Sequence, residues 1–315
     1  MKALVSVLRP LVLAAALLPA AGWTQAPQTL FSTSFETGEG YDAGFELVGQ
    51  NSWMGQGTAG NGLVTRFSGE GQQAYVGFFD PLTNSEASFT TWRPITFDPI
   101  ASNKPVVTFR TTMEIVDSTS ADPNKDDFRW EVFNTDGHRL FSLDFDNSTM
   151  GICYLLEDGV FRATPFSFVH DAVYDLEIKM DFENNLWLAN LSGTIVISNQ
   201  PIVQTAARRD LGDIAATWFF LTPNSPGDNA MVFDNYTITA ESIPTRPTLQ
   251  LLSVNNNQPL LQLIGEPNRS YILEASTDLR SWFPIKTNTP NDGSFQHLDT
   301  GATPLMHRHY RARVR

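Results

Sequence analysis

The chain has 315 residues, of which 42% are apolar and 17% are charged, so it can bury at least one large core. Its formal net charge of −13 excludes a strongly basic, nucleic-acid-binding protein, because an acidic surface repels the phosphate backbone. Its one cysteine, Cys153, excludes an intramolecular disulfide, and the apolar neighbours of Cys153 predict that it is buried.

Residues 1–26 have the features of a signal peptide. Lys2 and Arg9 supply the positive start, and the apolar run LVLAAALLPAA follows. This run is shorter than the roughly 20 residues of a membrane-spanning helix, and Pro10 and Pro19 interrupt the segment 1–26. We therefore expect cleavage rather than retention as a membrane anchor. The mature chain is expected to have no membrane span and to be exported to the periplasm, the cell surface or the medium.

Short strand-like runs, separated by turn residues, follow one another from Leu30 to Thr239. In residues 174–183, apolar side chains alternate with charged ones, which is typical of a strand with one face on a core and one in water. Only residues 203–214 suggest a short helix. We therefore predict an all-β fold, with a two-sheet antiparallel jelly-roll sandwich over residues 27–242. The clearest runs are 105–116, 127–134, 139–147, 174–183, 186–191, 194–198, 216–222 and 231–239.

A proline-containing segment, residues 243–248, ends this series of strands and predicts a linker. Residues 249–315 then contain a second series of short strand-like runs. A segment of about 70 residues is long enough for a small β-sandwich of the immunoglobulin or fibronectin-type-III kind. We therefore predict a second, small β-sandwich domain at the C-terminus.

Several stretches resemble known protein families. LFSTSFETGEGYDAGF, VYDLEIKMDFENNLWLANLSGTIV and NAMVFDNYTIT are similar to the opening, the strand–turn–strand unit and the closing strand of concanavalin A-like or laminin-G-like jelly rolls in secreted bacterial proteins. LEASTDLRSW and HYRARV resemble a C-terminal module of exported proteins from Verrucomicrobia and Planctomycetes. The resemblance implies a fold rather than an activity, because this fold hosts lectins, glycosidases, adhesion modules and structural spacers.

One carboxylate stands out in the last of these stretches. In MVFDNYTIT, a period of two places Asp234 on the same face as Val232, Tyr236 and Ile238. A buried, ionised carboxylate is costly unless it is paired. In many jelly-roll carbohydrate-binding modules an early Glu and a late Asp share a calcium ion, and by resemblance Glu36 and Asp234 take these positions. The alternative is that Phe233 faces the core and leaves Asp234 in water or capping a turn.

Sugar recognition, the commonest binding function of this fold, uses exposed aromatic rings beside amides and carboxylates. Trp53 is the leading candidate because its loop, QNSWMGQG, is rich in Gly, Asn and Gln. Packing in the core is the alternative for every ring, and we assign Trp130 and Trp187, which lie within alternating strands, to the core. The candidates for ligand binding are Trp53, Trp92, Tyr154 and Trp218.

No catalytic signature was found in the sequence. Glycosidases of this fold carry an E-x-D-x-E run of carboxylates on one strand, whereas the nearest segment here places Lys179 between Glu177 and Asp181. We therefore expect a secreted, monomeric, non-catalytic protein that binds a polysaccharide or cell-surface glycan and holds a structural calcium ion. The alternatives are a glycan-active hydrolase or lyase of the same fold, and a structural or adhesive surface protein without a small ligand.

Overall fold

The computed structural model describes residues 27–83, 85–243, 247–256, 258–302 and 308–315. These residues form two compact units, which divide at the segment between residues 243 and 247. The predicted signal peptide lies outside the described residues, as do residues 244–246 of the predicted linker. Within the described ranges the structure is all-β, as predicted, with no α-helix and therefore no helix that could cross a membrane.

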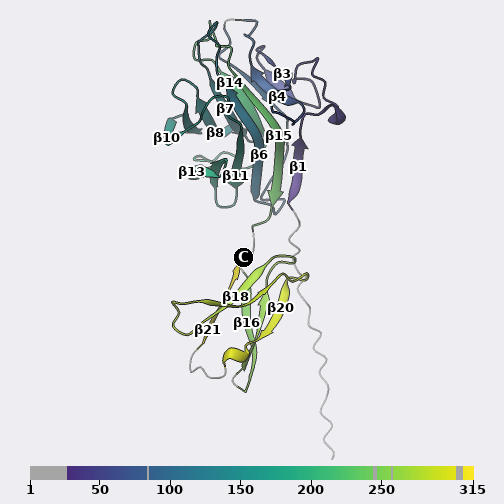
Figure 1. Ribbon diagram of the computed structural model, residues 1–315, viewed down its shortest axis with the longest axis vertical. Helices are drawn as coiled ribbons and strands as arrows, with labels where there is room; N and C mark the ends of the chain where they lie inside the picture. The colour runs from purple at the N-terminus through teal and green to yellow at the C-terminus, as the bar shows by residue number, and fades with distance from the viewer. Residues whose placement is uncertain (1–26, 84, 244–246, 257, 303–307) are drawn as a thin grey trace, which may run out of the picture. The chain divides into compact units, whose positions relative to one another are not determined.

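The larger unit consists of two antiparallel sheets (Figure 1). The eight-stranded sheet follows the order β13-β12-β11-β6-β15-β4-β3, with β1 paired to β15. Its strands are β13 (Thr194–Pro201), β12 (Leu186–Leu191), β11 (Tyr174–Asp181), β6 (Val106–Val116), β15 (Ala230–Glu241), β4 (Gln73–Gly77), β3 (Asn61–Val64) and β1 (Gln28–Thr33).

The seven-stranded sheet follows the order β10-β9-β8-β7-β14-β5-β2. Its strands are β10 (Phe161–Ser167), β9 (Gly151–Leu156), β8 (Arg139–Asp146), β7 (Asp127–Phe133), β14 (Asp213–Phe219), β5 (Ser88–Trp92) and β2 (Met54–Gln56). One continuous core of buried residues from both sheets joins them into a β-sandwich, which confirms the predicted fold class.

Aromatic side chains from distant segments fill the centre of this core. The ring of Trp130 lies 5.0 Å from that of Phe109 and 5.2 Å from that of Phe233, measured between centroids. The hydroxyl of Tyr236 donates a 2.7 Å hydrogen bond to the carbonyl oxygen of Ile214 on the other sheet. Buried Tyr side chains need such a partner, so this bond fixes the distance between the two sheets at this point.

Strand β15 departs from the strict alternation that its sequence suggests. Its pairing with β6 shifts register between Asp234 and Thr237, and Asn235 has a positive φ of 52°, so the strand contains a β-bulge. The bulge places Phe233 and Tyr236 together in the core, and leaves Val232 in a separate apolar cluster. The prediction that Val232 and Tyr236 share a face is therefore wrong.

The predicted helix at residues 203–214 is also absent. Asp213 instead begins β14, and Leu211 bridges to Phe97. The alternation of buried Ile214, Ala216 and Trp218 explains the strand, because these side chains all reach the core from one face.

The smaller unit has two three-stranded sheets. One consists of β16 (Thr248–Asn255), β17 (Gln258–Ile264) and β20 (Ser294–Leu298), and the other of β19 (Phe283–Asn288), β18 (Tyr271–Ser276) and β21 (His309–Val314). Buried side chains such as Leu263 and Leu273 come from both sheets. The described part of the chain also contains two short 3-10 turns, η1 (Thr37–Glu39) in the larger unit and η2 (Thr300–Ala302) in the smaller one.

Candidate functional site

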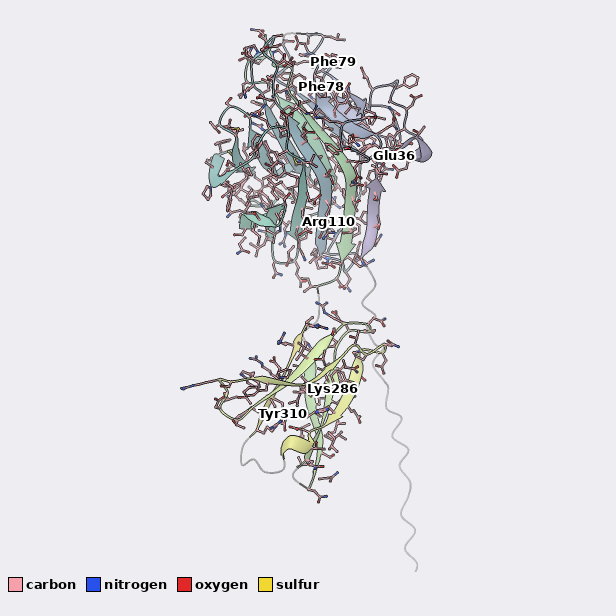
Figure 2. The ribbon with its side chains drawn as sticks, viewed as in Figure 1. Glu36, Phe78, Phe79, Arg110, Lys286 and Tyr310 are labelled. Carbon is pink, nitrogen blue, oxygen red and sulfur yellow. The ribbon has the colours of Figure 1, made fainter. Side chains whose placement is uncertain are left out.

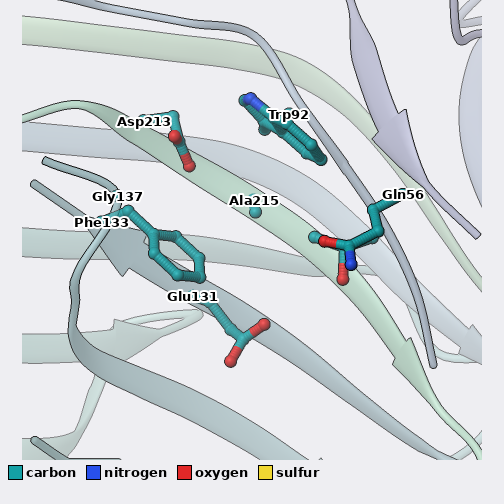
Figure 3. Close-up of a pocket in the computed structure, with 8 residues that line it drawn as sticks. Gln56, Trp92, Glu131, Phe133, Gly137, Asp213 and Ala215 are labelled. Carbon is teal, nitrogen blue, oxygen red and sulfur yellow. The ribbon is translucent and has the colours of Figure 1, made fainter. Parts of the chain in front are cut away.

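A cavity of about 390 Å³ opens on the outer face of the seven-stranded sheet (Figure 3). Its volume is within the range of about 300–1,000 Å³ that is usual for small-molecule sites. Figure 3 shows Trp92 and Phe133 on opposite sides of the cavity, with Ala215 between them. The residues that line it are Gln56, Thr90, Trp92, Glu131, Phe133, Gly137, Asp213 and Ala215.

The strand register explains why these side chains meet. Trp130 and Val132 of β7 are in the core, so the alternating Glu131 and Phe133 lie on the outer face. On the adjacent strand β14, Ala215 is opposite Glu131 and Asp213 is opposite Phe133. The pocket is thus built on paired strands, which hold its side chains in a fixed arrangement.

Glu131 is anchored by its neighbours. Its carboxylate accepts a 2.8 Å hydrogen bond from the hydroxyl of Thr217 and a 3.3 Å hydrogen bond from Nη1 of Arg139. The Thr217 hydroxyl in turn lies 3.0 Å from that of Thr90, another residue of the pocket wall. These contacts fix the orientation of Glu131 before any ligand arrives.

Asp213 is in a different environment. No described residue forms a hydrogen bond or an ion pair with its carboxyl group. Burial raises the pKa of Asp213 to about 7, and the negative charge of Glu131 raises it further in the same direction. The pocket therefore contains a carboxyl group that is free to accept or donate a hydrogen bond to a ligand.

A second acidic position lies beside the pocket, in the same sheet. Asp144 of β8 pairs with Arg129 of β7 at 3.1 Å, and the Arg129 guanidinium lies 4.0 Å from the centre of the Phe219 ring. Burial raises the pKa of Asp144 to about 7, although Arg129 acts in the opposite direction. Cys153, opposite Asp144 on β9, is buried as predicted, and burial raises the pKa of its thiol to about 12, which makes it unreactive.

The four predicted aromatic ligand-binding residues have different positions. Only Trp92 lines the pocket. Trp53 is 2% exposed and Trp218 is 0% exposed, so the prediction that they contact a ligand is wrong. The Trp53 indole donates a 2.9 Å hydrogen bond to the Tyr41 hydroxyl. Its ring packs against Phe35 and Tyr236 in the core. Tyr154 is half-buried and packs edge-on against Trp187, away from the pocket lining.

Four residues of the pocket were not predicted from the sequence: Gln56, Glu131, Phe133 and Asp213. The sequence pattern could have indicated Phe133 as a binding residue, since it is an aromatic residue on the otherwise charged face of an alternating strand. Asp213 was hidden because the segment that contains it was assigned to a helix. Trp130 and Trp187, which were assigned to the core, are both buried.

Glu36 and Asp234, the predicted calcium ligands, lie near each other at the point where β15 changes partners. Along one edge of β15, β4 pairs with residues 230–233 and β1 pairs with residues 236–240. Asp234 lies between these two pairings and is 1% exposed. Glu36 follows the end of β1 (Figure 2). Phe233 faces the core, as in the alternative interpretation, yet Asp234 remains buried.

The local hydrogen bonds compensate only in part for the burial of the Asp234 carboxylate. One of its oxygens accepts a 2.7 Å hydrogen bond from its neighbour's amide at Asn235, but the other has only a 3.5 Å contact with Nε2 of Gln73. Burial raises the pKa of Asp234 to about 6, against the effect of these hydrogen bonds, and the charges of Glu36 and Glu70 raise it further.

Glu70 lies near enough for its charge to act on Asp234, but it does not complete a three-carboxylate cluster with this pair among the described residues. The described residues contain no group of three or more His, Cys, Asp or Glu that could hold a metal ion. The backbone of Gly71 approaches Glu36 so closely that a Cβ at this position would overlap the carboxylate. A cation at this position would therefore be held by two carboxylates, with backbone carbonyl oxygens and water as further ligands, a donor set that suits calcium.

Comparison of the sequence with known protein families finds no match, and no curated protein matches either. Among solved structures, the chain is similar to a sialidase at 9% identity and a TM-score of 0.42, over 59% of this chain and 17% of the sialidase. It is also similar to arcelin-5, a lectin-like defence protein from Phaseolus vulgaris, at 13% identity and a TM-score of 0.44, over 69% of this chain and 99% of arcelin-5.

A third similar structure is the carbohydrate-binding module CBM66 from Bacillus subtilis. It is 13% identical, with a TM-score of 0.38, over 60% of this chain and 95% of the module. At these identities and TM-scores the likenesses define neither a family nor a ligand for this chain.

Proposed function

We propose that the protein is an exported, non-catalytic carbohydrate-binding protein whose ligand occupies the pocket on the seven-stranded sheet. The observation that supports this function is the pairing of two aromatic rings, Trp92 and Phe133, with the polar groups of Gln56, Glu131 and Asp213 around one cavity. An aromatic ring covers the apolar face of a pyranose, while carboxyl and amide groups bind its hydroxyls.

The natural ligand in this proposal is a sugar unit of a polysaccharide or a cell-surface glycan, bound by a monomer outside the cytoplasm. The C-terminal unit, residues 247–315, serves as an accessory module of the fibronectin-type-III kind. Its sequence resemblance to modules of exported bacterial proteins supports this role.

A glycan array tests the function. The full chain without its predicted signal peptide is expected to give reproducible hits that share a sugar unit, and an alanine at Trp92 is expected to abolish them. An array without reproducible hits would contradict carbohydrate binding and would favour a structural or adhesive role.

We also propose that Glu36 and Asp234 hold a structural calcium ion. The buried carboxylate of Asp234, with one oxygen almost without a partner, supports this site. Such an ion would neutralise both carboxylates and would connect the end of β1 to β15 where β4 ends.

A glycan hydrolase is a second candidate function, and one observation favours it. Glu131 and Asp213 are two carboxyl groups in different environments that line one pocket, which is the arrangement that acid–base cleavage of a glycosidic bond requires. In such a reaction protonated Asp213 would donate its proton to the departing oxygen as the glycosidic bond breaks, and the Glu131 carboxylate would take a proton from the water that bonds to the sugar carbon. Release of reducing sugar from a polysaccharide panel, abolished by Asp213→Asn, would support this function over simple binding.

A further inference from the structure

The pocket is acidic. Among the described residues that line it, Glu131 and Asp213 are the charged ones, and none is Lys or Arg. Arg139 contacts Glu131, but no described residue forms an ion pair with Asp213. A sulfated sugar or a uronic acid in this pocket would be repelled by an unpaired like charge.

The geometry of the two carboxyl groups suits a cation. Glu131 is opposite Ala215, and Asp213 lies two residues from Ala215 on the same strand, so the two acids are diagonal neighbours on adjacent strands. Such neighbours are about 7–8 Å apart, and their β-carbons are somewhat closer. Because both carboxyl groups line one cavity, an ammonium group bound in it would lie near both of them and could donate a charge-assisted hydrogen bond to either.

The aromatic walls favour the same ligand. Trp92 and Phe133 flank the cavity, and the face of an aromatic ring attracts a cation as well as the apolar face of a sugar. The whole larger unit is acidic as well, since residues 27–245 carry 29 Asp and Glu against 11 Lys and Arg. The electrostatic field of this net negative charge attracts a cationic polymer and repels an anionic one.

From these observations we propose that the pocket takes a protonated amino sugar of a polysaccharide, with its ring on Trp92 and its ammonium group between the carboxylates of Glu131 and Asp213. The proposal rests on the proposed carbohydrate-binding function and specifies its ligand class. A bound ammonium group would supply the counter-charge that Asp213 does not have in the protein. Because burial raises the pKa of Asp213, binding would also release a proton near neutral pH.

The test compares an oligomer of glucosamine with an oligomer of N-acetylglucosamine of the same length. The two differ only in the acetyl group on nitrogen, which removes the positive charge. Isothermal titration calorimetry of the full chain without its predicted signal peptide is expected to show binding of the glucosamine oligomer at least about tenfold tighter. Its affinity is expected to fall as salt increases, because the contact is ionic. Equal affinity, or tighter binding of the N-acetylated oligomer, would overturn the proposal.

Variants locate the effect. Asp213→Asn is expected to weaken binding of the glucosamine oligomer about tenfold, and to weaken binding of the N-acetylglucosamine oligomer less, because the Asn amide still accepts a hydrogen bond from a sugar hydroxyl. Glu183→Gln, which removes the same charge from an exposed site on the turn after β11, is the control and is expected to change nothing. If Asp213→Asn does not fold, competition experiments on the unchanged protein replace it: free glucosamine is expected to displace the oligomer, and free N-acetylglucosamine is not.

The remaining outcomes separate the two proposals. Binding of neutral glycans without the glucosamine oligomer would overturn the amino-sugar proposal and leave carbohydrate binding intact. Absence of binding to any glycan would overturn both. Equal displacement by a linear polyamine such as spermidine would show that the pocket recognises the charge alone, and would overturn the assignment of a sugar.

Discussion

The carboxyl groups of Glu131 and Asp213 line one pocket from adjacent strands, but only Glu131 receives hydrogen bonds from other described residues. The protein thus orients one carboxylate and leaves the other free. Burial of a carboxyl group without a partner lowers stability, and such a cost is typical of a position retained for ligand binding.

The first prediction concerns the pH dependence of stability. The pKa of Asp213 is about 7 in the folded protein, and its ordinary value is 3.8. As pH rises from about 4 to about 7, the unfolded state releases this proton first, so the fold loses stability over that interval. Asp213→Asn removes the effect. We expect the variant to match the unchanged protein near pH 4 and to be more stable near pH 8 by roughly 1–2 kcal/mol, after allowance for solvent screening.

Urea unfolding at the two pH values measures this difference. A variant that is less stable than the unchanged protein near pH 8 would show that Asp213 is paired in the folded state.

The second prediction concerns Trp92. Trp92→Ala removes the ring that covers the sugar, and we expect the affinity for the glycan ligand to fall at least about tenfold, or about 1.4 kcal/mol. Trp92→Phe keeps an aromatic face and is expected to retain most of the affinity. Phe161→Ala, at an exposed aromatic residue of β10 in the same sheet, is the control. Calorimetry that shows equal losses for Trp92→Ala and Phe161→Ala would argue against a specific site.

The third prediction concerns Trp53, for which we expect a change in stability rather than in glycan affinity. Its ring is buried and its indole is hydrogen-bonded to Tyr41, so Trp53→Phe leaves a buried hydroxyl without this partner and a small cavity. We expect a loss of roughly 1–3 kcal/mol of stability without a change of glycan affinity. Thermal unfolding and titration calorimetry on the same sample check both parts. A loss of glycan affinity in a stably folded Trp53 variant would show that Trp53 contributes to ligand binding, as the sequence predicted.

The sequence predicted the architecture well where alternation is regular. In residues 174–183 the buried Leu176, Ile178 and Met180 are the apolar members of the alternating pattern, and β11 occupies 174–181. The bulge in β15 could not be foreseen, because it depends on where β4 ends and β1 begins along the same edge. A shift of one residue moves every later side chain to the other face.

The pocket was predictable only in part. Glu131 and Phe133 were placed on one face of their strand by the alternation in 127–134. Their meeting with Asp213 depends on the pairing of β7 with β14, and these strands are separated by about 80 residues of sequence. The register between such distant strands is set by the packing of the core, so the sequence of neither strand shows which residues will be paired. The same limit explains Trp53, whose polar loop suggested exposure, whereas its ring packs in the core against Phe35 and Tyr236 from distant segments.

The fourth prediction concerns calcium. If Glu36 and Asp234 hold an ion, a chelator is expected to lower the melting temperature and added calcium to restore it. Asp234→Ala is expected to abolish this response, and Glu36→Gln to reduce it. Glu183→Gln, at an exposed acidic residue, serves as the control and should respond as the unchanged protein does. Differential scanning calorimetry with and without chelator measures the effect, and identical curves would exclude a tightly bound structural ion.

The most direct measurement is a crystal structure of the protein with a bound oligosaccharide chosen from the glycan array. We expect a sugar ring in contact with the face of Trp92, and hydrogen bonds from the sugar to the carboxyl groups of Glu131 and Asp213. A sugar bound on another surface, with this cavity empty, would contradict the assignment of the pocket.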